Sequence, residues 1–379
     1  MSLAILDARQ WQQVVDLRSG HPTESDTPLT NTVRGLLDRH PFPGDRDGGS
    51  NAWVTDTALD LIDRYDPGFV FLTYAQQYYS CRYSPLSAEE HRAHVARAFA
   101  EAARFARESG LTTVVVGTGE LVPATTPIDL EGLDGLNVAS NWSAHYAGLY
   151  DLSARDLDTL ANHPDLERIV SRQELLDLFG GGPDDGKRLP DFMAVARTGG
   201  YFKGTSLRRL RMIPEPSAVI PVSQNLGPVT AITDIRARLL DRLGREKVAL
   251  ALVEGVGCDL FGLPHTTCAN GRDWFRYEPG DAQYLALSTG AHSVFQHNGG
   301  YRYYLDDGEH KPYPFSGYFT EIPTGTIGEA YAGRSIAVGN RSMFMHVCTG
   351  CDVTCECFAR NLYNQGLMAV IRRQDKAAA

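Results

Sequence analysis

The sequence predicts an α/β fold with a mostly parallel central sheet and helices on both faces, and two observations lead to this prediction. Two short apolar runs, Phe69–Thr73 and Thr112–Val116, flank a long helical pattern over Glu89–Glu108. Parallel strands need a crossover of this kind, so the unit predicts two parallel strands of one sheet. A later apolar run, Val248–Val253, has the length and composition of another buried strand.

The remaining elements continue this alternation of strands and helices. Further strands are predicted at Phe192–Ala196, Ser335–Val338, Met343–Val347 and Leu367–Ile371. Further helices are predicted at Asp56–Tyr65, Ile232–Leu243 and Cys351–Gln365. Gly110 follows the first helix and is expected to end it.

Two segments interrupt the alternation. Residues 180–186 are rich in glycine and predict a surface loop. Between two aromatic runs, Asp307-Gly308 indicates a turn, so a small β-hairpin flap is expected at about residues 295–320. Its aromatic side chains either stack on a ligand or pack against one another.

The chain is expected to form a single α/β domain. At 379 residues it is long enough for one large domain. We assign the domain to residues 1–375, with the first half of the sheet in 51–245 and the second half in 246–375. Residues 376–379 are expected to be a tail outside the fold.

Composition limits the classes of partner. The chain is 43% apolar and 22% charged, as in ordinary globular proteins. A formal net charge of −10 argues against nucleic acid or an anionic membrane as the partner and favours a small molecule. No apolar stretch approaches the roughly 20 residues that span a bilayer. The N-terminus lacks a secretory pattern, and the seven cysteines are an odd number, so a cytoplasmic protein with reduced thiols is expected. The oligomeric state is left open.

Four of the cysteines lie close together near the C-terminus, at Cys348, Cys351, Cys355 and Cys357. On the predicted helix, Cys351 and Cys355 share one face and Cys357 points away. A metal site would therefore use Cys348, Cys351 and Cys355, with His346 as a possible fourth ligand. The alternatives are a reactive thiol and plain packing of small apolar side chains, and the sequence leaves all three open.

Several segments resemble the alkaline phosphatase-like superfamily, which includes phosphodiesterases and cofactor-independent phosphoglycerate mutases. Residues 66–85 and Val114–Val122 resemble the strand, metal-binding loop and second metal-binding turn of that family. Leu189–Ala196 and Val248–Gly257 resemble two further strands. The resemblance implies a metal-dependent hydrolase of a phosphate ester, with Zn, Mn or Mg bound at the ends of the strands. The order of the segments implies a circular permutation.

The residues at the family's metal positions differ from the usual aspartates and histidines. The resemblance places Glu254 at the Asp-Gly position, Gln77 and Cys81 in the loop, and Gly119 and Glu120 in the second turn. It therefore implies Glu254, Glu120 and Cys81 as candidate metal ligands. Because a two-metal site needs its whole ligand set, the fold is expected to match more closely than the chemistry.

Independently of the resemblance, acid, thiol and imidazole side chains follow the Val248–Val253 strand. Candidate catalytic residues are Glu254, Cys258 and His292, and His265 is a further candidate metal ligand. Ligand sites of α/β folds gather at the carboxyl ends of strands, which is why Glu254 leads this group. The group is suited to a metal site or to a nucleophile with its base.

Three functions follow from these expectations. The first is a metal-dependent hydrolase of a small phosphorylated or phosphate-ester-like substrate. The second is a repurposed, non-catalytic relative that binds a small molecule or a partner in the same place. The third is a thiol- or metal-centred enzyme of secondary metabolism that uses the segment Cys348–Cys357.

Overall fold

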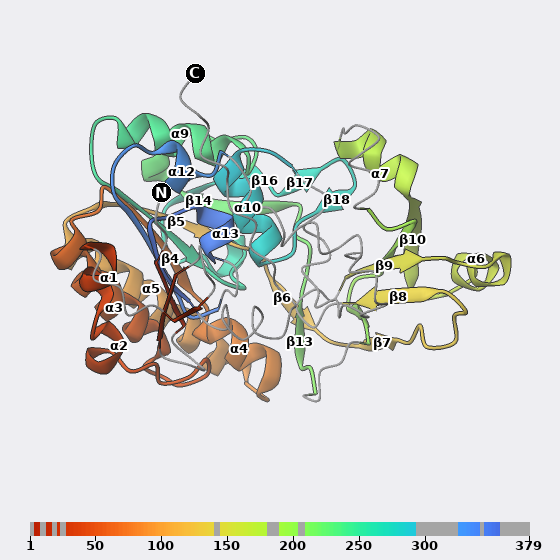
Figure 1. The fold of residues 1–379 in the computed structure, drawn as a ribbon. Coiled ribbons are helices and arrows are strands. Elements are labelled where there is room, and N and C mark those ends of the chain that lie inside the picture. Colours follow the sequence, from red (N-terminus) through yellow and green to blue (C-terminus); the bar gives the residue numbers. More distant parts are fainter. Residues whose placement is uncertain are drawn as a thin grey trace, which may run out of the picture.

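The computed structural model describes residues 4–7, 13–16, 21–22, 28–139, 145–179, 189–203, 209–292, 325–341 and 345–356. Within them, ten strands form a central sheet (Figure 1). In spatial order these are β16 (His265–Ala269), β14 (Val219–Ser223), β5 (Thr112–Gly117), β15 (Val248–Val253), β4 (Phe69–Tyr74), β19 (Ser335–Gly339), β20 (Val353–Glu356), β1 (Ala4–Asp7), β2 (Gln13–Asp16) and β3 (His21–Pro22). The six strands from β5 to β1 are parallel, and antiparallel strands extend both ends.

Helices cover both faces of this sheet, as the sequence predicts. One face carries α1 (Pro28–Val33), α2 (Leu36–Arg39), α3 (Ser50–Tyr65) and α5 (Ala88–Ser109). The other face carries α9 (Asp234–Leu243), α10 (Asp281–Thr289), α12 (Ile327–Ala330) and α13 (Met345–Thr349). In β4, Phe69 and Phe71 join the core under α9 and α10, whereas Val70 and Leu72 join the core under α3 and α5. This alternation is the period-two geometry of a strand that is buried on both sides.

The long helix α5 shows how local sequence sets the limits of an element. The Ser87 hydroxyl accepts the backbone N–H of Glu90, and the Glu90 carboxylate accepts the backbone N–H of Ser87. This reciprocal cap satisfies two donors at the start of the helix. The helix ends at Gly110, whose left-handed φ of 66° suits a residue without a side chain.

A second, four-stranded antiparallel sheet lies between β5 and β14 in the sequence. It consists of β10 (Leu166–Ser171), β11 (Phe192–Ala196), β9 (Tyr146–Tyr150) and β8 (Leu136–Ala139), with helices α6 (Ala154–Ala161) and α7 (Arg172–Phe179). Figure 1 shows this unit to the right of the central sheet. Its contact with the main body includes the Tyr146 hydroxyl, which donates to the backbone oxygen of Arg276 at 2.7 Å.

Short pairs of strands connect the two sheets and flank the main body. These are β6 (Leu121–Pro123) with β13 (Met212–Pro214), β7 (Thr126–Ile128) with β12 (Gly200–Phe202), and β17 (Gly271–Arg272) with β18 (Phe275–Arg276). The element α4 (Gln76–Tyr83) directly follows β4, and two 3-10 turns lie at Gln224–Leu226 and Cys258–Leu260.

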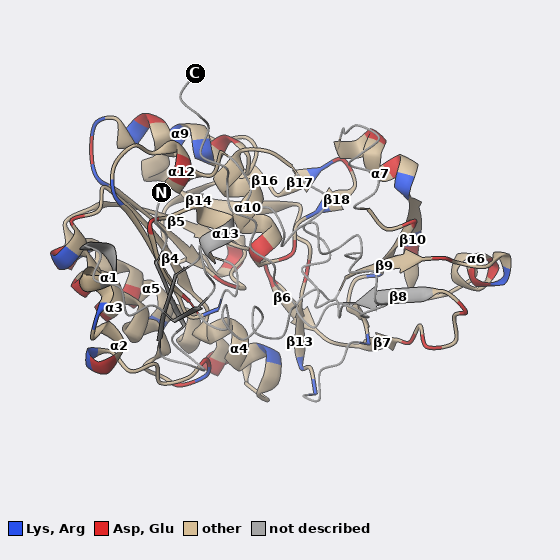
Figure 2. Ribbon diagram, viewed as in Figure 1, with Lys and Arg blue, Asp and Glu red and all other residues tan. Residues whose placement is uncertain are grey.

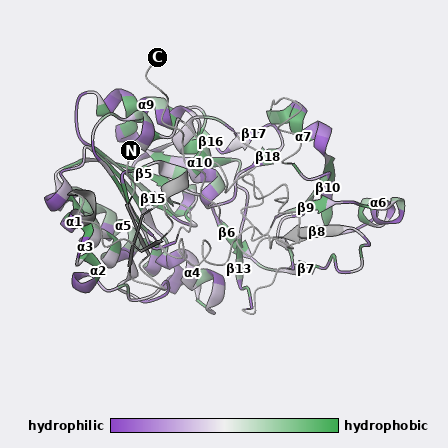
Figure 3. Cartoon of the chain, in the orientation of Figure 1, coloured by the Kyte–Doolittle hydropathy of each residue, from purple (hydrophilic) through white to green (hydrophobic). Residues whose placement is uncertain are grey.

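Charge and hydropathy follow these layers. Lysine, arginine, aspartate and glutamate lie mainly on the outer helices and loops in Figure 2. Figure 3 shows the apolar residues concentrated on the strands and on the inner sides of the helices. None of the helices in the described ranges combines the length and apolar character that crossing a lipid bilayer requires.

Most of the predicted elements are confirmed, but two predictions near the C-terminus are wrong. Within the predicted strand Met343–Val347, the described residues 345–347 belong instead to the helix α13, Met345–Thr349. The predicted helix Cys351–Gln365 begins instead with the strand β20, Val353–Glu356. The reason is pairing across the sheet, since β20 lies parallel to β19 and forms hydrogen bonds with it. These contacts stabilise a strand more than the four-residue spacing of Cys351 and Cys355 favours a helix.

One further predicted strand lies elsewhere than expected. Phe192–Ala196 is a strand, but it pairs in the antiparallel sheet and not in the central one. The flap at 295–320, the loop at 180–186, the strand Leu367–Ile371 and the tail lie outside the described residues, as does the rest of the predicted C-terminal helix.

Candidate functional site at the carboxyl edge of the central sheet

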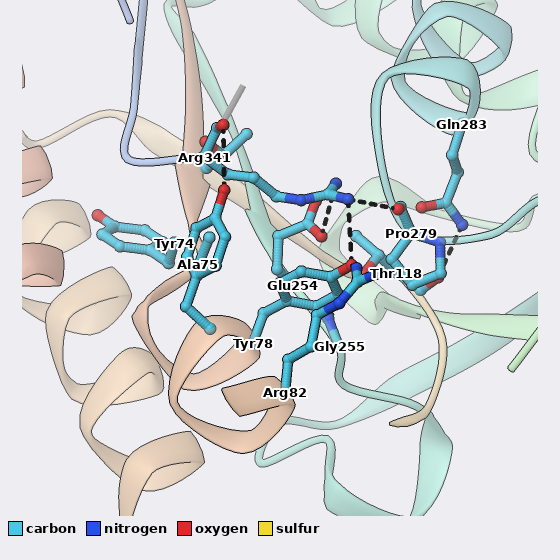
Figure 4. Close-up of polar contacts among 12 residues, drawn as sticks. Tyr74, Ala75, Tyr78, Arg82, Thr118, Glu254, Gly255, Pro279, Gln283 and Arg341 are labelled. Carbon is cyan, nitrogen blue, oxygen red and sulfur yellow. Dashed lines mark hydrogen bonds and ion pairs between the residues drawn. The ribbon is translucent and has the colours of Figure 1, made fainter. Parts of the chain in front are cut away.

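Polar side chains gather where the central parallel strands end. Glu254 directly follows β15, Arg341 comes two residues after β19, Thr118 follows β5, and α4 follows β4. Figure 4 shows Glu254, Arg341 and Tyr78 of α4 converging at this edge. Since the strands are parallel, their carboxyl ends meet on one side of the sheet, and side chains from distant parts of the sequence come together there.

The chain connections favour a ligand site at this point. The connection from β4 to β5 runs through α5 on one face of the sheet. The connection from β15 to β19 runs through α10 and α12 on the other face. The strands β4 and β15 are neighbours, and the helices α5 and α10 of these connections lie on opposite faces, although the chain leaving β15 first packs Val256 and Phe261 under α3 and α5. Open α/β sheets bind ligands at such switch points.

The centre of the site is a buried ion pair between Glu254 and Arg341. Arg341 Nη1 lies 3.0 Å from Glu254 Oε2, and the side chains are 5% and 0% exposed. Arg341 Nη2 also donates to the backbone oxygen of Pro279 at 2.8 Å. Within the described part of the chain, Glu254 Oε1 and Arg341 Nε have no hydrogen-bond partner. Buried polar atoms are usually satisfied, so this pair retains unused hydrogen-bonding capacity.

A second buried guanidinium lies beside this pair. Arg82, 1% exposed, donates to the Tyr78 hydroxyl and lies 5.5 Å from the centroid of the Tyr78 ring. The guanidinium of Arg341 lies 4.5 Å from the same centroid, and its Nη2 is 3.4 Å from the Tyr78 hydroxyl. Tyr78 therefore joins two arginines through its ring and its hydroxyl.

Hydrogen bonds from amide side chains hold the ends of β4 and β19 in place. Gln77 Nε2 donates to the backbone oxygens of Tyr74 and Glu254, at 2.7 and 2.9 Å. Gln77 Oε1 accepts from Asn51 Nδ2 at 3.1 Å. Asn340 Oδ1 accepts the backbone N–H of Ala75 at 2.7 Å. Both hydrogen-bonding groups of the Gln77 amide thus serve the backbone framework.

A second chain of hydrogen bonds supports the residue after Glu254. The N–H of Gly255, whose φ is 69°, donates to the Thr118 hydroxyl at 2.9 Å. Gln283 Nε2 donates to the Thr118 backbone oxygen and to Asn270 Oδ1, both at 2.8 Å. This chain fixes the direction in which the backbone leaves β15 and so the position of Glu254.

The electrostatic environment favours the neutral form of Glu254. Burial raises the pKa of Glu254 to about 7, with a further increase from Asp281, and the attraction of Arg341 offsets only part of this. The same carboxylate helps to hold the pKa of Arg341 above its usual value, so the guanidinium stays charged. Near neutral pH the site therefore exchanges between an ion pair and a charged arginine beside a neutral acid.

Of the four residues grouped from the sequence, only Glu254 lies at the centre of this site. Cys258 is partly exposed at the start of the 3-10 turn beyond β15, and burial and Glu120 both raise its pKa. Glu120 is exposed, and its side chain packs against Gly257. Glu120 and Cys258 are thus neighbours of each other on the outer side of the turn.

The two histidines are separated from Glu254 by the geometry of their elements. His265 is the first residue of β16, and its Nδ1 lies 2.9 Å from the backbone oxygen of Leu263. β16 is the edge strand of the sheet and is separated from β15 by β14 and β5, so His265 lies away from Glu254, beside the ring of Phe261. His292 follows the far end of α10, where its ring stacks on Tyr277 at 5.8 Å. Residue Gly280, at the other end of α10, is the one that lies against Arg341.

The cysteine cluster is divided by the sheet. Cys348 and Cys351 belong to the core on the α10 face, and Cys355 belongs to the core on the α3 face. All three are fully buried, as side chains that pack in a core are. Burial raises the pKa of Cys351 to about 12. The side chain of His346, in α13, and residue Cys357 lie outside the described residues.

Among the residues that the structure describes, the candidate metal ligands do not come together as a set. Cys81 is buried in an apolar cluster with Tyr79 and Leu121, and burial raises its pKa to about 12. Glu254 faces a guanidinium, and the Gln77 amide is engaged in the backbone framework. Within the described ranges, no group of three His, Cys, Asp or Glu side chains is placed to hold a metal ion. These residues do not fit the two-metal centre that the resemblance implies.

Sequence reasoning missed three residues of the site: Arg341, Tyr78 and Gln283. Arg341 comes three residues after the predicted strand Ser335–Val338. This position, just beyond the carboxyl end of a strand, is the one feature of the sequence that could have marked it as a site residue. Tyr78 and Gln283 stand in the helices α4 and α10, where nothing in the sequence marks them. Comparison of the chain with protein-family models, with curated proteins and with solved structures found no match.

Proposed function

We propose that this protein binds a small anionic molecule, a phosphate ester or a close analogue, at the carboxyl edge of the central sheet. We further propose that it is a repurposed, non-catalytic relative of the metal-dependent hydrolases that its sequence resembles. The observation that carries the proposal is the buried pair of Arg341 and Glu254, in which Arg341 Nε and Glu254 Oε1 remain without partners among the described residues.

The chemistry of the pair suits an oxyanion that also carries a proton donor. A guanidinium presents several N–H groups in a planar fork that matches phosphate and carboxylate oxygens. When Glu254 is neutral, the charge of Arg341 is available to a ligand, and the acid can itself donate a hydrogen bond. Arg82 adds a second buried cation next to Tyr78.

The residues at the positions that the resemblance assigns to metal ligands support the binding of an anion without a metal ion. Arg341 lies 3.0 Å from the carboxylate that the resemblance assigns to a metal ion, so a fixed cation already occupies that neighbourhood. A resident divalent ion would have to displace the guanidinium and would lack companion ligands from Gln77 and Cys81. We therefore derive no step through a metal.

One observation favours the hydrolase as a second candidate. The pKa of Glu254, at about 7, is that of a group able to donate or accept a proton at neutral pH. A hydrolase would use this proton transfer at the leaving group of a phosphate ester. The third candidate, a thiol- or metal-centred enzyme, has less support because the buried cysteines lie on opposite faces of the sheet.

Calorimetric titration with inorganic phosphate tests the binding proposal. The wild type should bind phosphate, and Arg341→Met should bind at least tenfold more weakly. Arg334→Met is the matched control, because Arg334 precedes β19 and is exposed at the opposite end of the same strand. Glu254→Gln keeps the shape of the acid without its charge and should bind as well as the wild type or better. No binding by the wild type, or equal losses in both arginine variants, would overturn the proposal.

A substrate panel separates the two candidate functions. Phosphate monoesters and diesters are incubated with the wild type in the presence of Mn²⁺, Zn²⁺ or Mg²⁺. The binding proposal expects no turnover. Turnover that is abolished by Glu254→Gln and reduced by Glu120→Gln would replace it with the hydrolase.

A further inference from the structure

The side chain of Gln283 has an unused acceptor at the same edge of the sheet. Gln283 is 2% exposed, and within the described ranges no group donates a hydrogen bond to its Oε1. A buried amide oxygen without a donor is costly unless water or a ligand supplies one. Gln283 therefore offers a site for a hydrogen-bond donor.

The hydrogen-bond network fixes which atom of this amide remains free. Asn270 Nδ2 donates to the backbone oxygens of Ser217 and Tyr277, at 3.0 and 2.8 Å, so Asn270 Oδ1 must be an acceptor. Gln283 Nε2 donates to that oxygen and to the Thr118 backbone oxygen. Rotating the Gln283 amide would place an oxygen against two oxygens. The unused atom is consequently the acceptor Oε1.

Gln283 lies at the end of α10 that faces the guanidinium of Arg341. A Cβ on Gly280 would lie 2.8 Å from Arg341 Nη1, so this part of the chain faces the arginine. Gln283 follows three residues later, in the first turn of α10, and hence on the same side of the helix. Three residues advance a helix by about 4.5 Å. In Figure 4 the Gln283 amide lies across from Arg341, with Pro279 between them.

We infer that the ligand is a phosphate ester with a free hydroxyl group on the carbon next to the ester carbon, and that Gln283 accepts the hydrogen bond of that hydroxyl. This inference rests on the proposed function, in which Arg341 binds the phosphate. Gln283 reaches this edge from the first turn of α10, and Arg341 reaches it from the end of β19. Gln283 then acts as a specificity-determining residue, because it distinguishes hydroxylated esters from plain alkyl esters.

Two probes that differ by one hydroxyl group test the inference. Calorimetry on the full chain compares 2-hydroxyethyl phosphate with ethyl phosphate, and inorganic phosphate serves as the reference. The wild type should bind the hydroxylated ester about tenfold more tightly, the effect of one well-made buried hydrogen bond. In Gln283→Met both esters lose the support that Gln283 gives to Thr118, but the hydroxylated ester should lose about tenfold more, so that the preference vanishes.

A structural role of Gln283 would give a different result. Thr118→Val is the control, because it removes the hydroxyl that accepts from Gly255 and should weaken both esters by the same factor. Equal affinities of the wild type for the two esters overturn the inference and leave the proposed function in place. The same conclusion follows if Gln283→Met weakens both esters equally. If neither ester nor inorganic phosphate binds to the wild type, the proposed function fails as well.

Discussion

The guanidinium of Arg341 lies 4.5 Å from the centroid of the Tyr78 ring, and this contact joins the end of β19 to the helix that follows β4. The two residues are 263 positions apart in the sequence. Because Arg341 also pairs with Glu254 after β15, one side chain links the ends of three neighbouring strands. The predictions below begin with this linkage.

Arg341→Met should reduce the free energy of unfolding by about 3–5 kcal/mol at pH 8, because the buried Glu254 must then either stay charged without its counter-ion or take up a proton, and both cost free energy. Urea denaturation measures the loss. The double variant Glu254→Gln/Arg341→Met should be more stable than Arg341→Met alone, since its buried acid is replaced by a neutral amide. The control Arg334→Met should change the free energy by less than about 1 kcal/mol, as expected at an exposed position. A double variant that is less stable than Arg341→Met would contradict the burial of a charged Glu254.

The stability of the wild type should contain a pH-dependent contribution from Glu254. Its pKa is raised from 4.5 to about 7 in the folded protein, so the folded state binds more protons than the unfolded state between these values. Its contribution to stability is therefore fully present below about pH 4.5 and is lost as the pH rises through about 7. The difference in unfolding free energy between the wild type and Glu254→Gln isolates this contribution.

The comparison with Glu254→Gln is necessary because His145 also makes the stability depend on pH, and its effect has the opposite sign. Burial lowers the pKa of His145 to about 4, so its contribution to stability is lost as the pH falls from about 6.5 to 4. The wild type and Glu254→Gln share this term, and it cancels in the comparison. A difference that stays constant from pH 5 to 8 would refute the raised pKa of Glu254.

The buried cysteines should behave as packed side chains with protonated thiols. Cys351→Ser should cost about 1–3 kcal/mol of unfolding free energy, because it places a hydroxyl in the apolar core. In the native protein Cys351 should react slowly with a thiol reagent, whereas the partly exposed Cys258 should react faster. Mass spectrometry after timed labelling gives both rates. Elemental analysis that found one metal ion per chain, lost in Cys348→Ser and Cys351→Ser, would contradict packing as the role of these thiols.

Two glycines near the site should respond differently to a single methyl group. In Gly117→Ala the new Cβ would lie 2.4 Å from the backbone oxygen of Val256, which cannot move without shifting the turn after β15. A loss of about 1–3 kcal/mol is expected. In Gly257→Ala the nearest atoms belong to the exposed side chain of Glu120, which can rotate into solvent, so the loss should be smaller. Thermal unfolding of the two variants compares them directly, and equal losses would show that Glu120 is held in place.

Local pattern was sufficient for many of the elements. The apolar runs at Phe69–Thr73, Thr112–Val116 and Val248–Val253 became parallel neighbours in the order β5, β15, β4. The crossover helix between the first two, with its terminal Gly110, also formed as predicted. Burial on both sides leaves a strand almost entirely apolar, and a long amphipathic helix has a clear period, so both are visible in the sequence.

The predictions failed where contacts across the sheet outweighed local spacing. The spacing of Cys351 and Cys355 suggested one face of a helix, but pairing with β19 made Val353–Glu356 a strand. Residues 345–349, in turn, form a helix that fills the connection between β19 and β20. The cysteines consequently belong to cores on opposite faces of the sheet, a separation that no spacing along the chain encodes.

For the site, the sequence by itself determined that Glu254 stands at the end of a buried strand, because strand and turn are local features. Only the tertiary structure decided what faces it. Arg341 and Tyr78 reach Glu254 because parallel strands bring their carboxyl ends to one edge, and Gln283 joins them because α10 begins at the same edge. His265 and His292, which follow Glu254 in sequence, are kept away from it by the place of β16 at the edge of the sheet and by the length of α10. The chemistry of the edge thus depends on strand order and helix direction, which are properties of the whole sheet.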